Sequence, residues 1–255
     1  MKVVRYLDDE QQPAWGLLED GTIFDLIGSL FSEHARGAAA GGVDELILLA
    51  PVSPSKVVCI GRNYAAHAAE LGNEVPSEPL IFLKPPSAVI GPGGAIVLPP
   101  LSNQVEHEAE LVLVVGQRCR NLSEENAMAV VFGFTCGNDV TARDLQRKDG
   151  QWSRAKGFDT FCPLGPWIVT ADEFDPGSAQ VQCRVNGELR QDGNTRQLIF
   201  SLPRLLHDVS AVMTLEPGDV IMTGTPAGVG PLRSGDEVEV IVEGIGTLQN
   251  LVGDG

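Results

Sequence analysis

Short apolar runs separated by turn residues far outnumber segments with helical periodicity, so the sequence predicts a mostly β, α+β protein. The runs beyond residue 54 are rich in valine and isoleucine, which favour strands, and glycine and proline separate them. No strand–helix–strand rhythm recurs, which argues against a doubly wound parallel sheet. The expected strands of this main body cover residues 56–60, 80–83, 95–98, 111–115, 167–170, 181–185, 220–222 and 238–242.

The N-terminal part of the chain predicts a small domain that is also rich in strands. Its apolar runs lie at residues 2–7, 14–18 and 22–26. Asp20-Gly21 between the last two runs is a strong hairpin signal. An alanine- and glycine-rich stretch follows and ends in two prolines within residues 51–54, which indicate a boundary. We therefore divide the chain into a small N-terminal β domain, residues 1–54, and a main domain, residues 55–255.

Helices are expected to be few. Residues 63–71 are alanine-rich, and residues 197–214 carry apolar side chains at helical spacing. Residues 123–130 open with Ser123 shortly before Asn126, a pattern typical of a helix start. These segments are the helices that the sequence predicts.

Composition limits the partners of this chain. With 18 basic and 34 acidic residues the formal net charge is −16, which argues against nucleic acid or an anionic membrane surface as the main partner. Aromatic residues, at 5%, are too sparse for a base-stacking surface. No apolar run approaches the ~18 residues of a membrane span, and the early Asp8-Asp9-Glu10 is not expected in a secretory signal peptide. Five scattered cysteines without a Cys-x-x-Cys motif predict buried, reduced thiols and a cytoplasmic protein.

Carboxylates occur where the pattern predicts a buried strand. Glu108 and Glu110 alternate directly before the apolar run 111–115, so on a strand they point to the same face. Such a pair repels unless a cation or a proton intervenes. A divalent ion bound through oxygens is the economical answer, with Mg²⁺ preferred to Ca²⁺ or Mn²⁺, and Asp139 at the end of another apolar run supplies a third carboxylate. A solvated strand edge for the glutamates, and turn or helix capping for Asp139, are the structural alternatives.

Basic residues gather just after Asp139. Five of the chain's 18 basic residues lie within fourteen positions there: Arg143, Arg147, Lys148, Arg154 and Lys156. A charge run commonly forms a solvated face, but Lys156 has aromatic neighbours that would desolvate it. Lys84 has a similar setting, because it ends an apolar run and precedes two prolines.

Two further features are candidates for chemistry. His67 and Glu70 lie three apart on the expected helix 63–71 and share a face, so the carboxylate can orient the imidazole and raise its basicity. An ordinary surface pair is the structural alternative. The glycine- and hydroxyl-rich segment 223–230 follows a strand, and its backbone N–H groups could hold a carboxylate, although hairpin turns would also explain its glycines.

Several segments together resemble the fumarylacetoacetate hydrolase superfamily, specifically its short branch of acylpyruvate hydrolases, oxaloacetate decarboxylases and the homoprotocatechuate-pathway isomerase/decarboxylase. The matching segments run in family order over about four-fifths of the chain: residues 58–67, 82–85, 107–111, 139–146, 155–159, 185–188 and 223–231. The first 54 residues resemble the small N-terminal domain of the isomerase/decarboxylase type.

The resemblance implies a catalytic domain built as a mixed β-sandwich roll with few helices, usually dimeric, that binds Mg²⁺ or Mn²⁺. The implied metal ligands are Glu108, Glu110 and Asp139. Lys156 would contact the enolate or carbonyl oxygen, and His67 with Glu70 would form the acid/base dyad. The implied substrate-binding residues are Arg62, Lys84, Arg143, Gln146 and Thr225.

The function that these parts predict is a Mg²⁺-dependent enzyme acting on a small anionic 2-oxo or 2,4-dioxo acid through a metal-stabilised enolate, by C–C bond hydrolysis or decarboxylation. The main alternative is the 2-hydroxyhepta-2,4-diene-1,7-dioate isomerase / 5-carboxymethyl-2-oxo-hex-3-ene-1,7-dioate decarboxylase activity of aromatic catabolism. A non-catalytic metal-binding module is the remote alternative. The resemblance also implies a homodimer.

Overall fold

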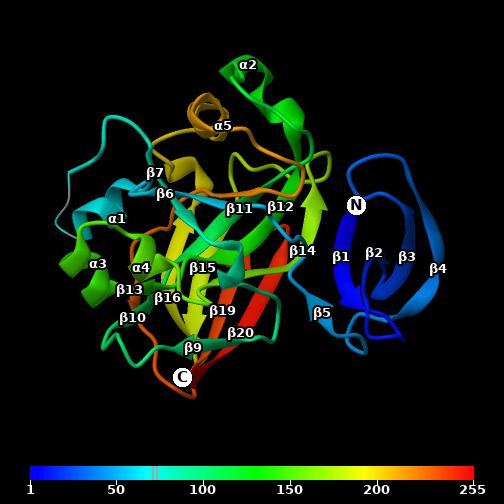
Figure 1. Cartoon of the computed structure of the whole chain (residues 1–255), viewed down its shortest axis with the longest axis horizontal. Coiled ribbons are helices and arrows are strands. Elements are labelled where there is room, and N and C mark those ends of the chain that lie inside the picture. The colour runs from blue at the N-terminus through cyan, green and yellow to red at the C-terminus, as the bar shows by residue number, and fades with distance from the viewer. Residues whose placement is uncertain (71, 73) are drawn as a thin grey trace.

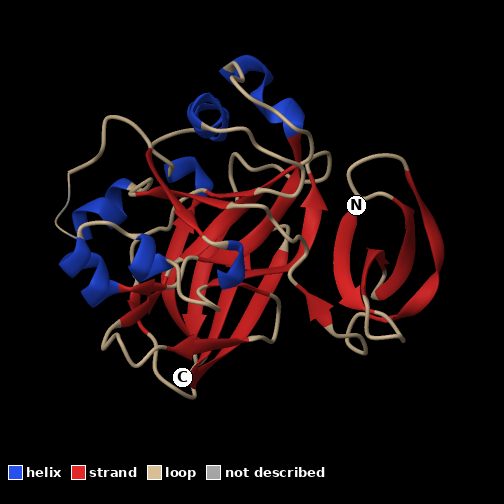
Figure 2. Cartoon of the chain, in the orientation of Figure 1, coloured by secondary structure: helices blue, strands red, loops and turns tan. Residues whose placement is uncertain are grey.

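The computed structural model describes residues 1–70, 72 and 74–255. Strands form the body of the molecule, and the helices lie at its left and upper edges in the view of Figure 1. Figure 2 shows the same predominance of strands over helices and confirms the predicted mostly β, α+β class.

The strands are β1 Lys2–Leu7, β2 Pro13–Glu19, β3 Thr22–Gly28, β4 His34–Gly42, β5 Leu48–Leu49, β6 Val57–Gly61, β7 Leu80–Lys84, β8 Val89–Ile90, β9 Ala95–Leu98, β10 Val105–His107, β11 Ala109–Val115, β12 Val131–Asn138, β13 Thr141–Ala142, β14 Cys162–Thr170, β15 Gln180–Val185, β16 Glu188–Asn194, β17 Val220–Met222, β18 Gly230–Pro231, β19 Glu237–Val242 and β20 Gly246–Asp254. The α-helices are α1 Ala65–Glu70, α2 Glu124–Ala127, α3 Arg143–Asp149, α4 Ser153–Lys156 and α5 Leu202–Val212. Short 3₁₀ helices cover Pro86–Ala88, Met128–Val130 and Thr195–Gln197.

Among the described residues these strands form sheets of 12, five and three strands. The largest runs in the order β4-β3-β2-β1-β14-β12-β11-β17-β6-β7, with β5 paired to β1 and β8 to β14. The five-stranded sheet has the order β16-β15-β19-β20-β9, and the smallest the order β13-β10-β18. Antiparallel pairs predominate, but β17–β6, β14–β8 and β20–β9 are parallel, so the sheets are mixed as predicted.

The first four strands form an antiparallel meander that stands to the right of the main body in Figure 1. The predicted hairpin is confirmed, because Glu19 pairs with Thr22 and the two turn residues have positive φ, 45° at Asp20 and 80° at Gly21. The alanine- and glycine-rich stretch forms the unpredicted strand β4. Since β1 pairs with β14, the large sheet runs on from the meander into the main body, and the division of the chain at residue 54 stays a prediction.

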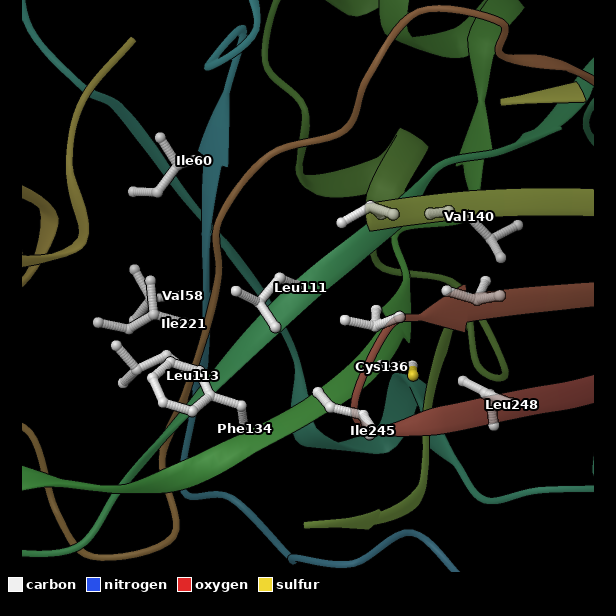
Figure 3. Packing of buried hydrophobic residues seen from close by; sticks show 14 of the residues in the cluster. Val58, Ile60, Leu111, Leu113, Phe134, Cys136, Val140, Ile221, Ile245 and Leu248 are labelled. Atoms are coloured by element: carbon white, nitrogen blue, oxygen red, sulfur yellow. The ribbon is translucent and has the colours of Figure 1, made fainter. Parts of the chain in front are cut away.

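Strand β11 is buried on both faces. Leu111 and Leu113 point into a core shared with Phe134 of β12 and Leu248 of β20, which lies between the two larger sheets (Figure 3). Val112, between them, belongs to a second apolar cluster on the other side of the sheet. This double burial explains why the run is uniformly apolar instead of alternating.

The predicted helices are present but shorter than expected. Helix α1 lies within residues 63–71, of which Leu71 falls outside the described residues. Residues 123–130 divide into α2 and a 3₁₀ turn, and α5 begins after Ser201 within the expected 197–214. Helices α3 and α4 were not predicted, because their charged sequences lack an apolar stripe.

All five cysteines are free and buried, as predicted. No helix in the described part of the chain is long and apolar enough to cross a bilayer.

Candidate active site

Three carboxylates converge where β11 begins and β12 ends. Glu108 lies in the break between β10 and β11, Glu110 on β11, and Asp139 directly after β12. The backbone joins the two ends, because Asp139 N–H donates to the Glu108 carbonyl at 2.9 Å. One ligand atom from each residue lies within 4.8 Å of the others, and all three side chains are buried. The expectation that Glu108 and Glu110 share a face is therefore met, although the strand is interrupted at Glu108.

Buried cations surround two of these carboxylates. Lys156 Nζ lies 2.8 Å from Glu108 Oε2 and 2.6 Å from Asp139 Oδ2. Arg143 reaches the other oxygen of Glu108 at 2.6 Å, and Lys84 the other oxygen of Asp139 at 2.5 Å. Glu110 has no such partner in the described structure, and accepts a hydrogen bond from the Gly224 N–H at 2.7 Å.

This arrangement separates the protonation behaviour of the two glutamates. Burial alone would raise the pKa of Glu108, but the charges of Lys156 and Arg143 outweigh it and hold that pKa well below its usual range. Burial and the negative charges of Asp139 and Glu108 raise the pKa of Glu110 well above its usual range. Glu110 is thus the carboxylate for which the protein itself supplies too little positive charge.

Glu106 is a further buried acid that sequence reasoning missed. It accepts from Arg143 Nε at 2.8 Å and from Gln104 at 2.6 Å. Its signal was the same alternation, since residues 106, 108 and 110 all place carboxylates on one side. The cluster then holds four carboxylates against the cations Lys84, Arg143 and Lys156.

The donor set fits a divalent cation. Carboxylate oxygens are the ligands of Mg²⁺, Mn²⁺ and Ca²⁺, and every ligand oxygen named above retains a free lone pair. A cation beside Glu110 would also offset the burial and the neighbouring negative charges that raise its pKa. The three residues that could hold the ion are the predicted ones.

A cavity of about 260 Å³ opens onto the carboxylates. It is lined by Ile60, Gly61, Arg62, His67, Phe82, Glu108, Glu110, Asp139, Arg143, Gln146, Arg147, Trp152, Lys156 and Thr225. Trp152 packs edge-to-face on Phe82 with ring centroids 5.0 Å apart, so one wall is aromatic. Gly61 makes room for this wall, because a Cβ there would lie 2.6 Å from the Trp152 ring. Trp152 and Arg147 were not predicted as site residues.

His67 and Glu70, the predicted dyad, both lie on the short helix α1. His67 is buried and lines the cavity, and its Nδ1 lies 3.4 Å from Glu70 Oε2. Glu70 does not line the cavity; its two carboxylate oxygens accept from the Gly228 N–H at 3.0 and 3.2 Å. Glu70 therefore links the histidine to the glycine-rich segment.

The segment 223–230, which we call the site loop, lies against β11 and Asn63. Thr223 and Thr225 donate their hydroxyl protons to the carbonyls of Leu111 and Ala109, both at 2.8 Å. Asn63 donates to the Thr223 carbonyl at 2.8 Å. The loop thus delivers the Gly224 N–H to Glu110 and Thr225 to the cavity wall.

The structure brings most predicted site residues to this one cavity. Those that line it are Arg62, His67, Glu108, Glu110, Asp139, Arg143, Gln146, Lys156 and Thr225. Lys84 differs from the prediction. It is fully buried behind Asp139, also donates to the Val140 carbonyl at 3.1 Å and does not line the cavity. Its geometry supports holding Asp139 in place instead of the predicted contact with substrate.

The chain belongs to the fumarylacetoacetate hydrolase family: the family model described as Fumarylacetoacetate (FAA) hydrolase C-terminal matches residues 56–253. A second family model, described as Rv2993c-like, N-terminal, matches residues 1–51. Membership confirms the resemblance inferred from the motifs.

The chain is similar to several named enzymes. A mitochondrial oxaloacetate tautomerase from Bos taurus is 49% identical over 219 residues, which cover 82% of this chain and 70% of the relative. The structure of a 5-carboxymethyl-2-hydroxymuconate delta-isomerase from Mycobacterium smegmatis matches with a TM-score of 0.93 at 46% identity, covering 100% of both chains. That of a maleylpyruvate hydrolase from Sphingobium sp. SYK-6, in complex with manganese (II) ion and pyruvate, matches with a TM-score of 0.83 at 33% identity, again covering 100% of both chains. The chain is an enzyme of the fumarylacetoacetate hydrolase superfamily.

Proposed function

We propose that this enzyme uses a divalent cation to form the enolate of a small anionic 2-oxo acid, and that it cleaves a C–C bond of that acid by hydrolysis or decarboxylation. The observation that carries the proposal is the convergence of Glu108, Glu110 and Asp139 with Lys156 and His67 on one cavity. The manganese and pyruvate in the Sphingobium hydrolase structure support both the metal and the 2-oxo acid.

The three carboxylates would hold the cation, Mg²⁺ by preference with Mn²⁺ or Ca²⁺ as alternatives. Such an ion supplies polarisation of a substrate carbonyl and lowers the pKa of water. Lys156 is kept charged beside it, because Asp139 and Glu108 raise the pKa of the amine more than burial lowers it.

The remaining groups of the cavity would have separate roles toward the substrate. The Lys156 ammonium would bind the oxygen that becomes negative when the enolate forms. His67, oriented by Glu70, would take a proton from water, which attacks the distal carbonyl of a 2,4-dioxo acid. The C–C bond then breaks, its electron pair enters the enolate, and the enolate carbon is finally protonated. Arg62, Arg143, Gln146 and Thr225 would bind the substrate's anionic and polar groups.

Isomerisation is the second candidate, and specific similarities favour it. The Mycobacterium smegmatis isomerase matches over the full length, and the Bos taurus relative is a tautomerase. The same groups would then move one proton between carbon and oxygen without breaking the C–C bond. A 2-hydroxy-diene diacid is the corresponding substrate.

We further propose that the enzyme is a cytoplasmic homodimer with no nucleic-acid or membrane partner. The support for the dimer is the family resemblance, which implies a homodimer. Sedimentation equilibrium of the purified chain tests the dimer, and a concentration-independent monomer mass would contradict it.

A substrate panel with Mg²⁺ tests the proposed function. Acetylpyruvate, fumarylpyruvate, oxaloacetate and a 2-hydroxy-diene diacid are followed spectrophotometrically, with CO₂ release measured for oxaloacetate. Loss of a dioxo chromophore supports hydrolysis, CO₂ release supports decarboxylation, and conversion without cleavage supports isomerisation. Inactivity on all four would contradict the proposal and favour the metal-binding module.

Glu110→Gln is the sharpest variant for the metal. Glu110 has no cationic partner among the described residues, so neutralising it breaks no ion pair, whereas Glu108→Ala would remove one of the two carboxylate partners of both Arg143 and Lys156. We expect Glu110→Gln to lose bound metal and turnover together, and the exposed Glu125→Gln to keep both. Turnover that survives loss of the metal would refute the enolate mechanism.

A further inference from the structure

Gln191 is a fully buried side chain behind the cavity that no prediction used. It lies on β16, with 0% of its surface exposed. Its amide forms four hydrogen bonds, to His107, Ala109, Thr225 and Pro226. An amide has two N–H donors and two acceptor lone pairs, so all of its hydrogen-bonding capacity is used.

The partners determine the orientation of this amide. The Ala109 N–H can only donate, and it reaches Gln191 Oε1 at 2.9 Å. The Pro226 carbonyl can only accept, and it lies 2.7 Å from Nε2. The oxygen of the amide therefore faces β11, and its nitrogen faces the site loop. His107 Nδ1, 3.0 Å from the same oxygen, must carry a proton.

This orientation also determines the Thr225 hydroxyl. Gln191 Nε2 donates to Thr225 Oγ1 at 2.7 Å, and that hydroxyl gives its single proton to the Ala109 carbonyl at 2.8 Å. The hydroxyl therefore has no proton left for the cavity. What Thr225 keeps for a ligand is one acceptor lone pair on its side chain.

Close packing joins β16 to the same loop. A Cβ at Gly193 would lie 2.4 Å from Pro226 Cβ, and one at Gly228 would lie 2.1 Å from the Arg190 carbonyl. The same Gly228 presents its N–H to Glu70. The site loop thus packs against strand β16. From there it contacts Ala109 through Thr225 and Glu70 of the dyad through Gly228.

We propose that Gln191 is a positioning residue, which holds the site loop on β11 so that Thr225 presents a hydroxyl acceptor to substrate and Gly228 keeps Glu70 in place behind His67. The inference deepens the proposed function and rests on it. The acceptor suits a protonated substrate oxygen, such as that of an enol.

Two substitutions test whether the hydrogen bonds of the Gln191 amide matter, because both keep a side chain of similar size. Gln191→Glu keeps the shape but cannot donate to both Thr225 Oγ1 and the Pro226 carbonyl, because an ionised carboxylate has no proton to donate and a protonated one has a single proton. Gln191→Met keeps the length and removes every hydrogen bond. With a substrate that the wild type turns over, we expect kcat/KM to fall by roughly 10–100-fold in both, with bound metal unchanged. Gln182→Met, on the neighbouring strand β15 with its amide directed to Asp192, should stay within about twofold of wild type.

A double-mutant cycle shows whether Gln191 acts through Thr225. Thr225→Val should lower kcat/KM, and Thr225→Ser, which keeps the hydroxyl, should restore most of it. If the mechanism holds, Gln191→Met combined with Thr225→Val loses less than the product of the two single losses. Wild-type kcat/KM in both Gln191 variants, multiplicative losses in the double variant, or metal lost in proportion to activity would each overturn the inference. If Gln191→Met does not fold, Gln191→Glu takes its place in the double-mutant cycle with Thr225→Val, and Thr225→Ser remains the variant that keeps the hydroxyl.

The proposed function can fail separately from this inference. A wild-type enzyme that turns over none of the four panel substrates contradicts the function. An active wild type with fully active Gln191 variants contradicts only the role of Gln191.

Discussion

Replacing Lys84 with methionine removes the cation behind Asp139 while keeping an unbranched side chain of similar length. Lys84 is fully buried and donates to Asp139 at 2.5 Å and to the Val140 carbonyl at 3.1 Å. Removing one partner of a buried pair costs about 3–5 kcal/mol, and Asp139 keeps Lys156, so we expect the lower end, about 3 kcal/mol. For a chain of this size the unfolding midpoint should then fall by roughly 6–12 °C.

Thermal unfolding followed by circular dichroism, in EDTA and in Mn²⁺, measures this effect. The variant cluster carries one positive charge fewer, so Mn²⁺ should raise its midpoint by more than it raises that of the wild type. Lys148→Met removes an exposed lysine and should change the unfolding free energy by less than about 0.5 kcal/mol. A loss in EDTA below about 1 kcal/mol, or an equal response to Mn²⁺, would refute the assigned role. A raised KM without a change in stability would instead support the direct contact between Lys84 and substrate that the sequence predicted.

Other outcomes test the dyad and the packing of the large sheet. His67→Ala should lower turnover by about 10²–10⁴-fold with metal content unchanged, measured by steady-state kinetics and elemental analysis; loss of metal as well would make His67 a ligand. Gly133→Ala would place a Cβ 2.3 Å from the Val169 carbonyl and should cost about 1–3 kcal/mol in urea unfolding. At Gly253 a Cβ meets nothing within 4 Å, so Gly253→Ala should be nearly neutral, and equal effects of the two would contradict the strand packing.

Strand positions were predictable where the side chains themselves favour strands. The runs at 95–98 and 220–222 match β9 and β17 in full, because they are apolar, rich in branched side chains and flanked by turn residues. Strands β4, β16 and β20 were not predicted, since they are rich in glycine or polar residues. They are strands because β3, β15 and β19 offer them paired backbones, which outweighs local propensity.

The site was predictable to the extent that it depends on local alternation and on the family resemblance. Two-residue alternation indicated that Glu108 and Glu110 share a face, and the structure has both in one carboxylate group with Asp139. Glu106 continues the same alternation, but its burial beside Glu108 depends on Arg143, which lies 37 positions away and which no local pattern connects to it. The roles carried over by resemblance stay predictions until variants are measured.

The amino-acid sequence by itself determined the mostly β class, the reduced buried cysteines, the acidic character of the chain and the pair of alternating carboxylates, since these follow from composition and short-range periodicity. Only the tertiary structure decided that Lys84 lies behind Asp139, that Trp152 forms a wall of the cavity and that Gln191 joins the site loop to β11. These contacts join segments 34 to 91 positions apart, and their geometry depends on strand order and register, which no local pattern specifies.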